Sequence, residues 1–242
     1  MRGAFLFAAA LAAPAPEYPP VWPAAFTAPF TERVSYGPVK STTTGTLLYS
    51  AQSPYGAAER LERASGEADR YCGGAKLLRA TPCTHLAANG TRYLLFPDLG
   101  ECCTCCTAAD GCGPTKQDWA KNASFANNAT VDVGGASVDA FKWTIKGLQE
   151  NDVYTPAAAT GAEQPPLRVY QSPDDDMVFG EAQIGAVDPS HFWLPAGGCS
   201  AQCGGVCALV GRRAEALRSA GRAEEAAASA AASSSAAAAV YK

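Results

Sequence analysis

Cysteines are the residues of this chain best suited to chemistry, and five of the ten lie within eleven positions. Neighbouring cysteines are too close for a relaxed disulfide with each other, and in an extended stretch their side chains point to opposite sides. Each cysteine of the cluster at 102–106 is therefore expected to reach a separate partner. The candidates lie upstream, nearby and far downstream, and the full set is Cys72, Cys83, Cys102, Cys103, Cys105, Cys106, Cys112, Cys199, Cys203 and Cys207.

Disulfides and a zinc site are the two chemistries open to these sulfurs. Cys199, Cys203 and Cys207 recur at roughly the spacing of zinc ligands, but structural zinc sites usually pair two Cys-x-x-Cys knuckles and need reduced thiols. Disulfides are therefore favoured, and no metal is expected. A bridge from the cluster to this downstream trio closes a loop of about a hundred residues and, taken alone, contributes about 4 kcal/mol in the chain-entropy model.

The two histidines, His85 and His191, suggest no catalytic centre. A cysteine or serine close in sequence does not supply the geometry that nucleophilic catalysis needs. The G-x-S-x-G, P-loop, H-E-x-x-H and G-x-G-x-x-G motifs are absent, so neither an enzyme nor a cofactor is expected. Both histidines are interpreted as surface loop residues. The acidic run 174–176 is interpreted as a solvated turn, with a weak calcium contact as the alternative.

The N-terminus and three sequons predict export. Residues 1–13 have the pattern of a signal peptide, in which Arg2 precedes an apolar stretch that ends at Pro14. N-glycosylation sequons begin at Asn89, Asn122 and Asn128. Paired cysteines also belong in an oxidising compartment. The expected location is outside the cell or in the secretory lumen.

Charge and hydropathy exclude two classes of partner. The formal net charge is −4, so the chain offers no general basic face for nucleic acid. It also has no apolar run of about 18 residues, the length needed to span a bilayer. The oligomeric state is left open by these numbers.

Strand patterns outnumber helix patterns in the body of the chain, residues 34–209. A β-prone run at 91–96 follows Asn89-Gly90, a strong hairpin signal. Residues 131–145 and 167–179 also have hairpin patterns, and 60–71 fits either a helical turn or a hairpin. Without a βαβ rhythm, the predicted fold class is mainly β: a curved antiparallel sheet or half-barrel with disulfide-rich loops.

Two flanking segments are set apart by composition. Residues 14–33 are rich in proline and alanine and are interpreted as an extended entry segment. Residues 210–242 form an Ala-rich, low-complexity tail, helical or disordered, to which no function is assigned.

Apolar residues on the expected strands have two interpretations. The favoured one is the core side of the sheet. The other is a pocket for a lipid-like ligand, since a curved sheet covered on one side can leave an apolar cavity. The candidate ligand-binding residues are Tyr93, Leu95, Phe141, Trp143, Ile145 and Phe179.

The segment 184–195, I-G-A-V-D-P-S-H-F-W-L-P, followed by Cys199, resembles the ending of ependymin-related proteins. The order of parts from 34 to 199 is also similar, including the early Gly45-x-Leu-Leu-Tyr strand. The chain departs from that family in its cysteine cluster, in the wider spacing of Pro195 and Cys199, and in everything beyond Cys199. The resemblance implies a LolA-like half-barrel in a secreted glycoprotein that holds hydrophobic ligands and associates with calcium. It makes Cys199 the terminal bridge cysteine and supplies no calcium ligand.

The expected function is that of a secreted, non-enzymatic glycoprotein whose curved sheet binds a hydrophobic small molecule or lipid. One alternative is a disulfide-rich extracellular interaction or matrix protein with a filled core. The other is a hydrolase with an unrecognised site.

Overall fold

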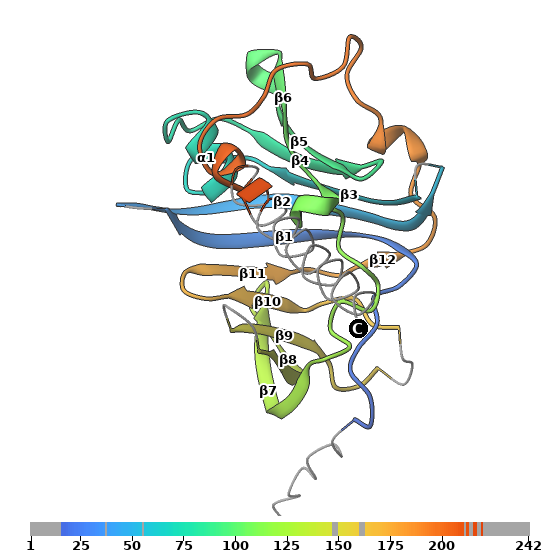
Figure 1. Cartoon of the computed structure of the whole chain (residues 1–242). Coiled ribbons are helices and arrows are strands. Elements are labelled where there is room, and N and C mark those ends of the chain that lie inside the picture. The colour runs from blue at the N-terminus through green and yellow to red at the C-terminus, as the bar shows by residue number, and fades with distance from the viewer. Residues whose placement is uncertain are drawn as a thin grey trace, which may run out of the picture.

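The structure is a computed structural model that describes residues 16–36, 38–54, 56–146, 150–159 and 163–210, together with residues 212, 215, 216 and 219 (Figure 1). The expected signal peptide and most of the Ala-rich tail lie outside the described residues. No helix in the described part is both long and apolar enough to cross a membrane.

Twelve strands of the described chain form one antiparallel sheet, with strand order β6-β5-β4-β3-β2-β1-β11-β10-β9-β8-β7 and β12 paired to β1. The sheet is open, because β6 and β7 end it without pairing to each other. The mainly β prediction is confirmed. The elements are β1 (Ala25–Tyr36), β2 (Val39–Ser53), β3 (Gly56–Arg63), α1 (Arg70–Ala75), β4 (Cys83–Ala88), β5 (Thr91–Phe96), η1 (Pro97–Leu99), β6 (Glu101–Thr107), η2 (Ala108–Asp110), β7 (Ser124–Val133), β8 (Ala136–Ile145), β9 (Asn151–Pro156), β10 (Arg168–Gln171), β11 (Asp175–Phe179), β12 (Gln183–Ile184) and η3 (Pro189–Phe192).

The hairpins predicted from turn residues are present. Asn89 and Gly90 join β4 to β5 with positive φ angles of 51° and 69°, as a tight hairpin turn requires. Hairpins β7–β8 and β10–β11 occupy the two other predicted positions. The ambiguous segment 60–71 contributes to a strand and then to a helix, because Asp69 caps α1 by accepting hydrogen bonds from the backbone N–H groups of Tyr71 and Cys72.

A long ribbon formed by β1 and β2 lies at the centre of the sheet (Figure 1). Strand β1 begins at Ala25, so the sheet starts before residue 34, the boundary that the composition suggested. Gly45 is essential to the ribbon, since a side chain there would collide with the Phe30 ring and with the carbonyl of Glu62.

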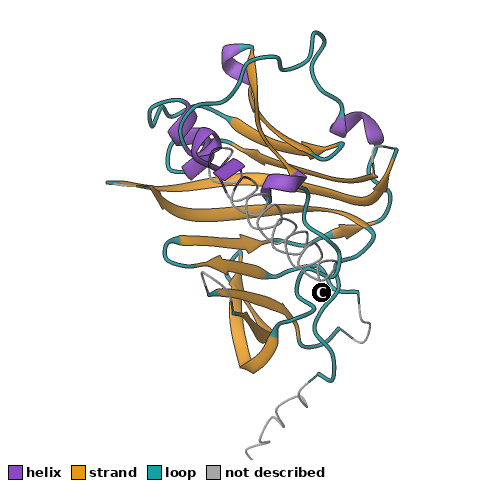
Figure 2. Ribbon diagram, in the orientation of Figure 1, coloured by secondary structure: helices purple, strands orange, loops and turns teal. Residues whose placement is uncertain are grey.

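One face of the sheet carries most of the core. Helix α1 and the connection from η2 to β7 lie over this face (Figure 2). Trp119, in that connection, packs against two of the apolar clusters. A third cluster, rich in cysteine, continues the same face towards β6. Residues of these clusters alternate along their strands with residues that point to the opposite face. That opposite face carries a smaller apolar cluster around Leu86 and Phe192.

A disulfide framework fastens β6 to the C-terminal segment 185–207, which we call the strap. Three bridges join β6 to the strap across sequence separations of 97, 100 and 102 residues. Pairing with this downstream trio is one of the possibilities that the sequence left open, and all ten cysteines are in disulfides. The five pairs are Cys72–Cys83, Cys102–Cys199, Cys103–Cys203, Cys105–Cys207 and Cys106–Cys112.

Candidate functional site

A groove crosses the face of the sheet opposite the main core. It consists of two adjoining cavities of about 780 Å³ and about 870 Å³ that share Arg60, Thr84 and Pro97. The first cavity is also lined by Val133 and Gly134 from the β7–β8 turn. Because β7 and β8 are remote from β2 and β3 in strand order, the sheet must curve around this face to bring that turn over the cavity.

The floor of the groove is a single cross-strand row that runs perpendicular to the strands. Its residues are register partners from β1 to β6, and all of them line one cavity or both. Five interstrand spacings of about 4.8 Å make the row about 24 Å long. In order the row is Pro29, Thr46, Glu62, Thr84, Leu95 and Cys102.

The middle of the groove is polar, and the charges of its ion pair, Arg60 and Glu62, cancel. Thr31 and Thr44 face each other across β1 and β2, and Thr46 lies beside them on β2. Arg60 pairs with Glu62, with 2.5 Å between Nε and Oε1. Hydroxyls beside a satisfied ion pair suit a polar head group better than a purely apolar one.

The end of the groove near β5 is apolar and is walled by the strap. Trp193 and Leu194 line it while remaining 57% and 37% exposed, and Leu95 forms its floor. Isolated exposed apolar residues are common, but a Trp-Leu pair along a cavity wall is typical of a binding surface.

Three anchors hold this wall in place. Phe192 is buried among Leu86, Leu95 and their neighbours. Arg60 donates a hydrogen bond from Nη1 to the carbonyl of His191 at 2.9 Å. The bridge from Cys199 to β6 fixes the other side of the segment. Trp193 therefore lies between fixed points and keeps its place over the groove.

The six candidate ligand-binding residues are not brought together. Phe141, Trp143 and Ile145 belong to one cluster on the core face, and Phe179 is buried in another. Only the remaining two, Tyr93 and Leu95, belong to the cluster on the groove side. Leu95 and Phe179 are the members of the set that line a groove cavity.

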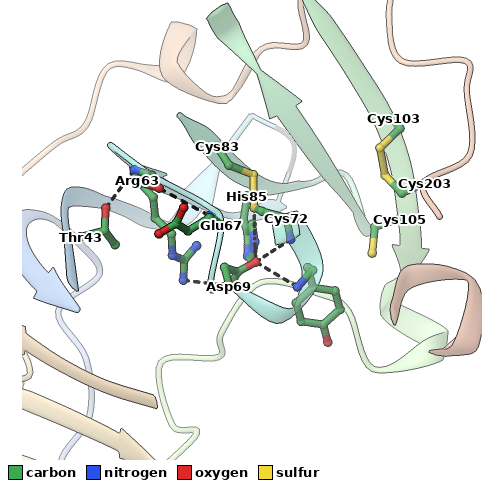
Figure 3. The surroundings of a disulfide bond; sticks show 12 residues. Thr43, Arg63, Glu67, Asp69, Cys72, Cys83, His85, Cys103, Cys105 and Cys203 are labelled. Atoms are coloured by element: carbon green, nitrogen blue, oxygen red, sulfur yellow. Dashed lines mark hydrogen bonds and ion pairs between the residues drawn. A yellow bond between two sulfur atoms is a disulfide. The ribbon is translucent and has the colours of Figure 1, made fainter. Parts of the chain in front are cut away.

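His85 is buried, so its interpretation as a surface loop residue is wrong (Figure 3). It lies on β4, and its Nε2 is 3.0 Å from Oδ1 of Asp69. Burial lowers the pKa of His85 against the opposing influence of Asp69, so the neutral ring donates Nε2–H to the carboxylate. The sulfur of Cys72, 3.2 Å from the same nitrogen, is part of a disulfide and can only accept. His191, by contrast, is exposed in η3, as expected.

The Asp69–His85 pair has no free thiol beside it. The nearest sulfurs, Cys72 and Cys83, are bonded to each other and offer no thiolate nucleophile. These two sulfurs and His85 approach one another as metal ligands would, but disulfide sulfur lacks the charge that zinc selects. The arrangement is structural: Asp69 caps α1 and links it to β4.

A buried ion pair between Glu32 on β1 and Arg63 on β3 joins the Asp69–His85 pair to form one network of charged side chains. Glu32, with an exposed fraction of 0%, accepts two hydrogen bonds from Arg63, at 2.6 Å from Nε and 2.8 Å from Nη2. Burial alone would lower the pKa of Arg63, but the charges of Glu32 and Asp69 outweigh burial and raise it. Burial likewise opposes ionisation of Asp69, yet His85 and Arg63 hold its pKa well below the usual range. Arg63 therefore stays protonated and Asp69 stays ionised near neutral pH.

Asp175 joins this network, which corrects the picture of 174–176 as a solvated turn. It begins β11, and burial followed by the charge of Glu32 raises its pKa to about 7. Asp176 instead makes a two-pronged ion pair with Arg168. Asp174 alone occupies the exposed turn position.

Sequence reasoning missed the strap residues that build the groove wall. A signal was present in Asp188-Pro189, because Asp followed by Pro is a common helix start. Asp188 does cap η3 by accepting a hydrogen bond from the N–H of Ser190 at 2.9 Å. That cap predicts a fixed turn before Trp193, but no local signal shows which strands the turn packs against.

No protein-family model matches this chain, and no curated protein matches it. Among solved structures, the chain is similar to a LolA superfamily protein from Nitrosomonas europaea, with 8% identity over 70% of this chain and 90% of that chain, at a TM-score of 0.34. It is also similar to PNGF-II in two crystal forms, with 11% and 10% identity over 74% and 70% of this chain, at TM-scores of 0.34 and 0.33. The chain spans 31% and 30% of the length of those PNGF-II chains.

Proposed function

We propose that this protein is a secreted, non-enzymatic glycoprotein whose curved sheet binds an amphiphilic, lipid-like molecule in the groove. The single observation that carries the proposal is the gradient along the cross-strand row, from Thr46 and Glu62 to Leu95 beneath Trp193. An acyl chain would bury apolar surface against Leu95, Trp193 and Leu194. A polar head would meet the threonine hydroxyls of β1 and β2.

The length of the groove supports this class of ligand. A floor of about 24 Å, obtained from the interstrand spacing, accommodates an extended long-chain amphiphile. The five disulfides fit an oxidising, extracellular environment, and three of them fix the strap that walls the groove. The exposed positions of Asn89, Asn122 and Asn128 are compatible with glycan attachment.

The test is titration with a fluorescent long-chain fatty acid. The proposal expects saturable binding of about one probe per protein. Trp193→Ala should weaken binding about tenfold, or about 1.4 kcal/mol, because the wall loses its largest apolar surface. Ile184→Ala is the matched control, since Ile184 is 63% exposed and does not line either cavity.

Two outcomes would contradict the proposal. Absence of saturable binding would favour the alternative of an interaction or matrix protein without a ligand site. Equal weakening by Trp193→Ala and Ile184→Ala would place the probe outside the groove. A fluorogenic palmitoyl ester tests the hydrolase alternative in parallel, and no release above buffer is expected.

A further inference from the structure

The two edge strands of the sheet, β6 and β7, differ in how far other described segments cover them. At the β6 edge, the N–H of Thr104 donates to the carbonyl of Ala201, and the N–H of Cys203 donates to the carbonyl of Thr104, each at 2.8 Å. Three disulfides hold the strap in this position. Another chain cannot add a strand to β6 at this point.

The β7 edge has no comparable cover from the described part of the chain. Strand β7 is ten residues long, and its only strand partner among the described residues is β8. A long edge strand can pair with another molecule, and proteins usually prevent this with proline, lysine, a bulge or a covering segment. Strand β7 contains neither proline nor lysine, and its single bulge lies near its start, between Phe125 and Asn127.

Two of the three sequons coincide with this edge. Asn128 lies on β7, and Asn122 lies just before its first residue, Ser124. Both asparagines are exposed, and the hydroxyl residues of the sequons, Ser124 and Thr130, belong to β7 and are exposed too. A glycan is bulky and hydrophilic, so it would exclude a second strand from its neighbourhood.

We propose that N-linked glycans at Asn122 and Asn128 shield the β7 edge and prevent two copies of this protein from pairing through it. This rests on the proposed secretory route. The third sequon provides a built-in comparison, because Asn89 lies in the β4–β5 turn, near the opposite end of the strand order. A glycan on Asn89 can aid solubility but cannot shield β7.

The experiment compares secreted variants of the full chain from eukaryotic cells. Ser124→Ala with Thr130→Ala removes both edge sequons and keeps both asparagines. Ser124→Thr with Thr130→Ser is the matched control that keeps both sequons, and Thr91→Ala removes only the Asn89 sequon. Site-specific mass spectrometry measures occupancy, and sedimentation velocity measures association. The proposal expects the edge-sequon variant to self-associate at tens of micromolar, while both controls stay monomeric.

A rescue variant shows whether association runs through β7. Adding Asn127→Lys to the edge-sequon variant should restore the monomer, because a lysine on the edge opposes strand pairing. If the variant is not secreted, trimming the glycans of the folded natural protein with an endoglycosidase must produce the same association.

The negative outcomes separate the two proposals. Bare Asn122 and Asn128 beside an occupied Asn89 would overturn the shielding proposal and leave the secretory route intact. Three bare asparagines would overturn both. Full occupancy with a monomeric edge-sequon variant, or with association that Asn127→Lys does not reverse, would also overturn shielding.

Discussion

At the scale of single residues, the decisive contacts are charges placed inside an apolar sheet. Glu32 shares a strand face with Phe30 and Val34, two residues away on either side. The period of two therefore predicts an inward position for Glu32. The pattern was missed because Pro29 made the first residues of β1 look like part of an extended, Pro-rich entry segment. The partner, Arg63, could not be foreseen, since the pairing of β1, β2 and β3 is a tertiary property.

Replacing Glu32 by Gln should destabilise the protein by about 3–5 kcal/mol, because the buried guanidinium of Arg63 loses its two-pronged partner and keeps only the more distant Asp69. The control is Lys121→Gln, which removes an exposed ion pair with Asp118 and should leave stability unchanged. The measurement is the free energy of unfolding in urea with disulfides intact. Similar free energies of unfolding for the two variants would show that the Glu32–Arg63 pair contributes no more to stability than an exposed ion pair.

Asp175 should make stability depend on pH. Its pKa of about 7 in the folded protein lies above the ordinary 3.8, so between these values the folded state binds a proton that the unfolded state releases. This contribution therefore favours folding below about pH 4 and is lost as pH rises to about 7.

Asp175→Asn removes that dependence. Relative to the natural protein, the variant should be equally stable near pH 4 and more stable by on the order of 4 kcal/mol at pH 8. The lowered pKa values of Asp69 and His85 give a pH dependence of stability with the opposite sign. Both proteins contain these residues, so this contribution cancels when the two stabilities are subtracted. A stability difference that does not grow between pH 4 and pH 8 would contradict this assignment.

At the scale of elements, the strap and β6 act as one unit. The three long-range bridges follow one another in the same order along β6 and along the strap, so they do not each close an independent loop. Once Cys103–Cys203 is formed, adding Cys102–Cys199 closes a ring of only about five residue steps, one along β6 and four along the strap. The contribution of about 4 kcal/mol expected of such a bridge alone therefore applies to the first bridge formed.

Removing a single bridge by Cys102→Ala with Cys199→Ala should cost only about 2 kcal/mol, the value for a short loop. Removing all three bridges together should cost several kcal/mol more than that, since the long loop is then released. Urea unfolding of the two variants makes the comparison. A cost of about 4–5 kcal/mol for the single pair would mean that the bridges act independently.

Much of the element pattern could be predicted from local signals. Asn89-Gly90 and Gly134-Gly135 specify hairpins, because their positive φ angles match tight turns. The crowding of Cys102 to Cys106 predicts that these cysteines bond to separate partners outside the cluster. The β1–β11 pairing could not be predicted, because it joins segments about 150 residues apart, and no local property records such a contact.

At the scale of the whole molecule, the two faces of the sheet have different roles: one face packs the main core, and the other carries the proposed binding groove. The core face carries the large aromatic clusters, while the opposite face keeps a groove with hydroxyls at its centre and apolar residues at one end. Sequence reasoning selected aromatic strand residues as ligand contacts, but aromatics such as Phe141 and Trp143 fill the core. The groove instead depends on strand register and on the strap, and neither is a local property of the sequence.

Trp193 offers the most direct test that a lipid-like molecule occupies the groove. The other three tryptophans, Trp22, Trp119 and Trp143, belong to the core clusters of the opposite face. A brominated long-chain fatty acid, which quenches tryptophan only at short range, should reduce the fluorescence of the natural protein saturably. Trp193→Phe should abolish the quenching while the protein still binds a fluorescent fatty acid. Quenching that persists in Trp193→Phe, or no saturable quenching in the natural protein, would contradict the account.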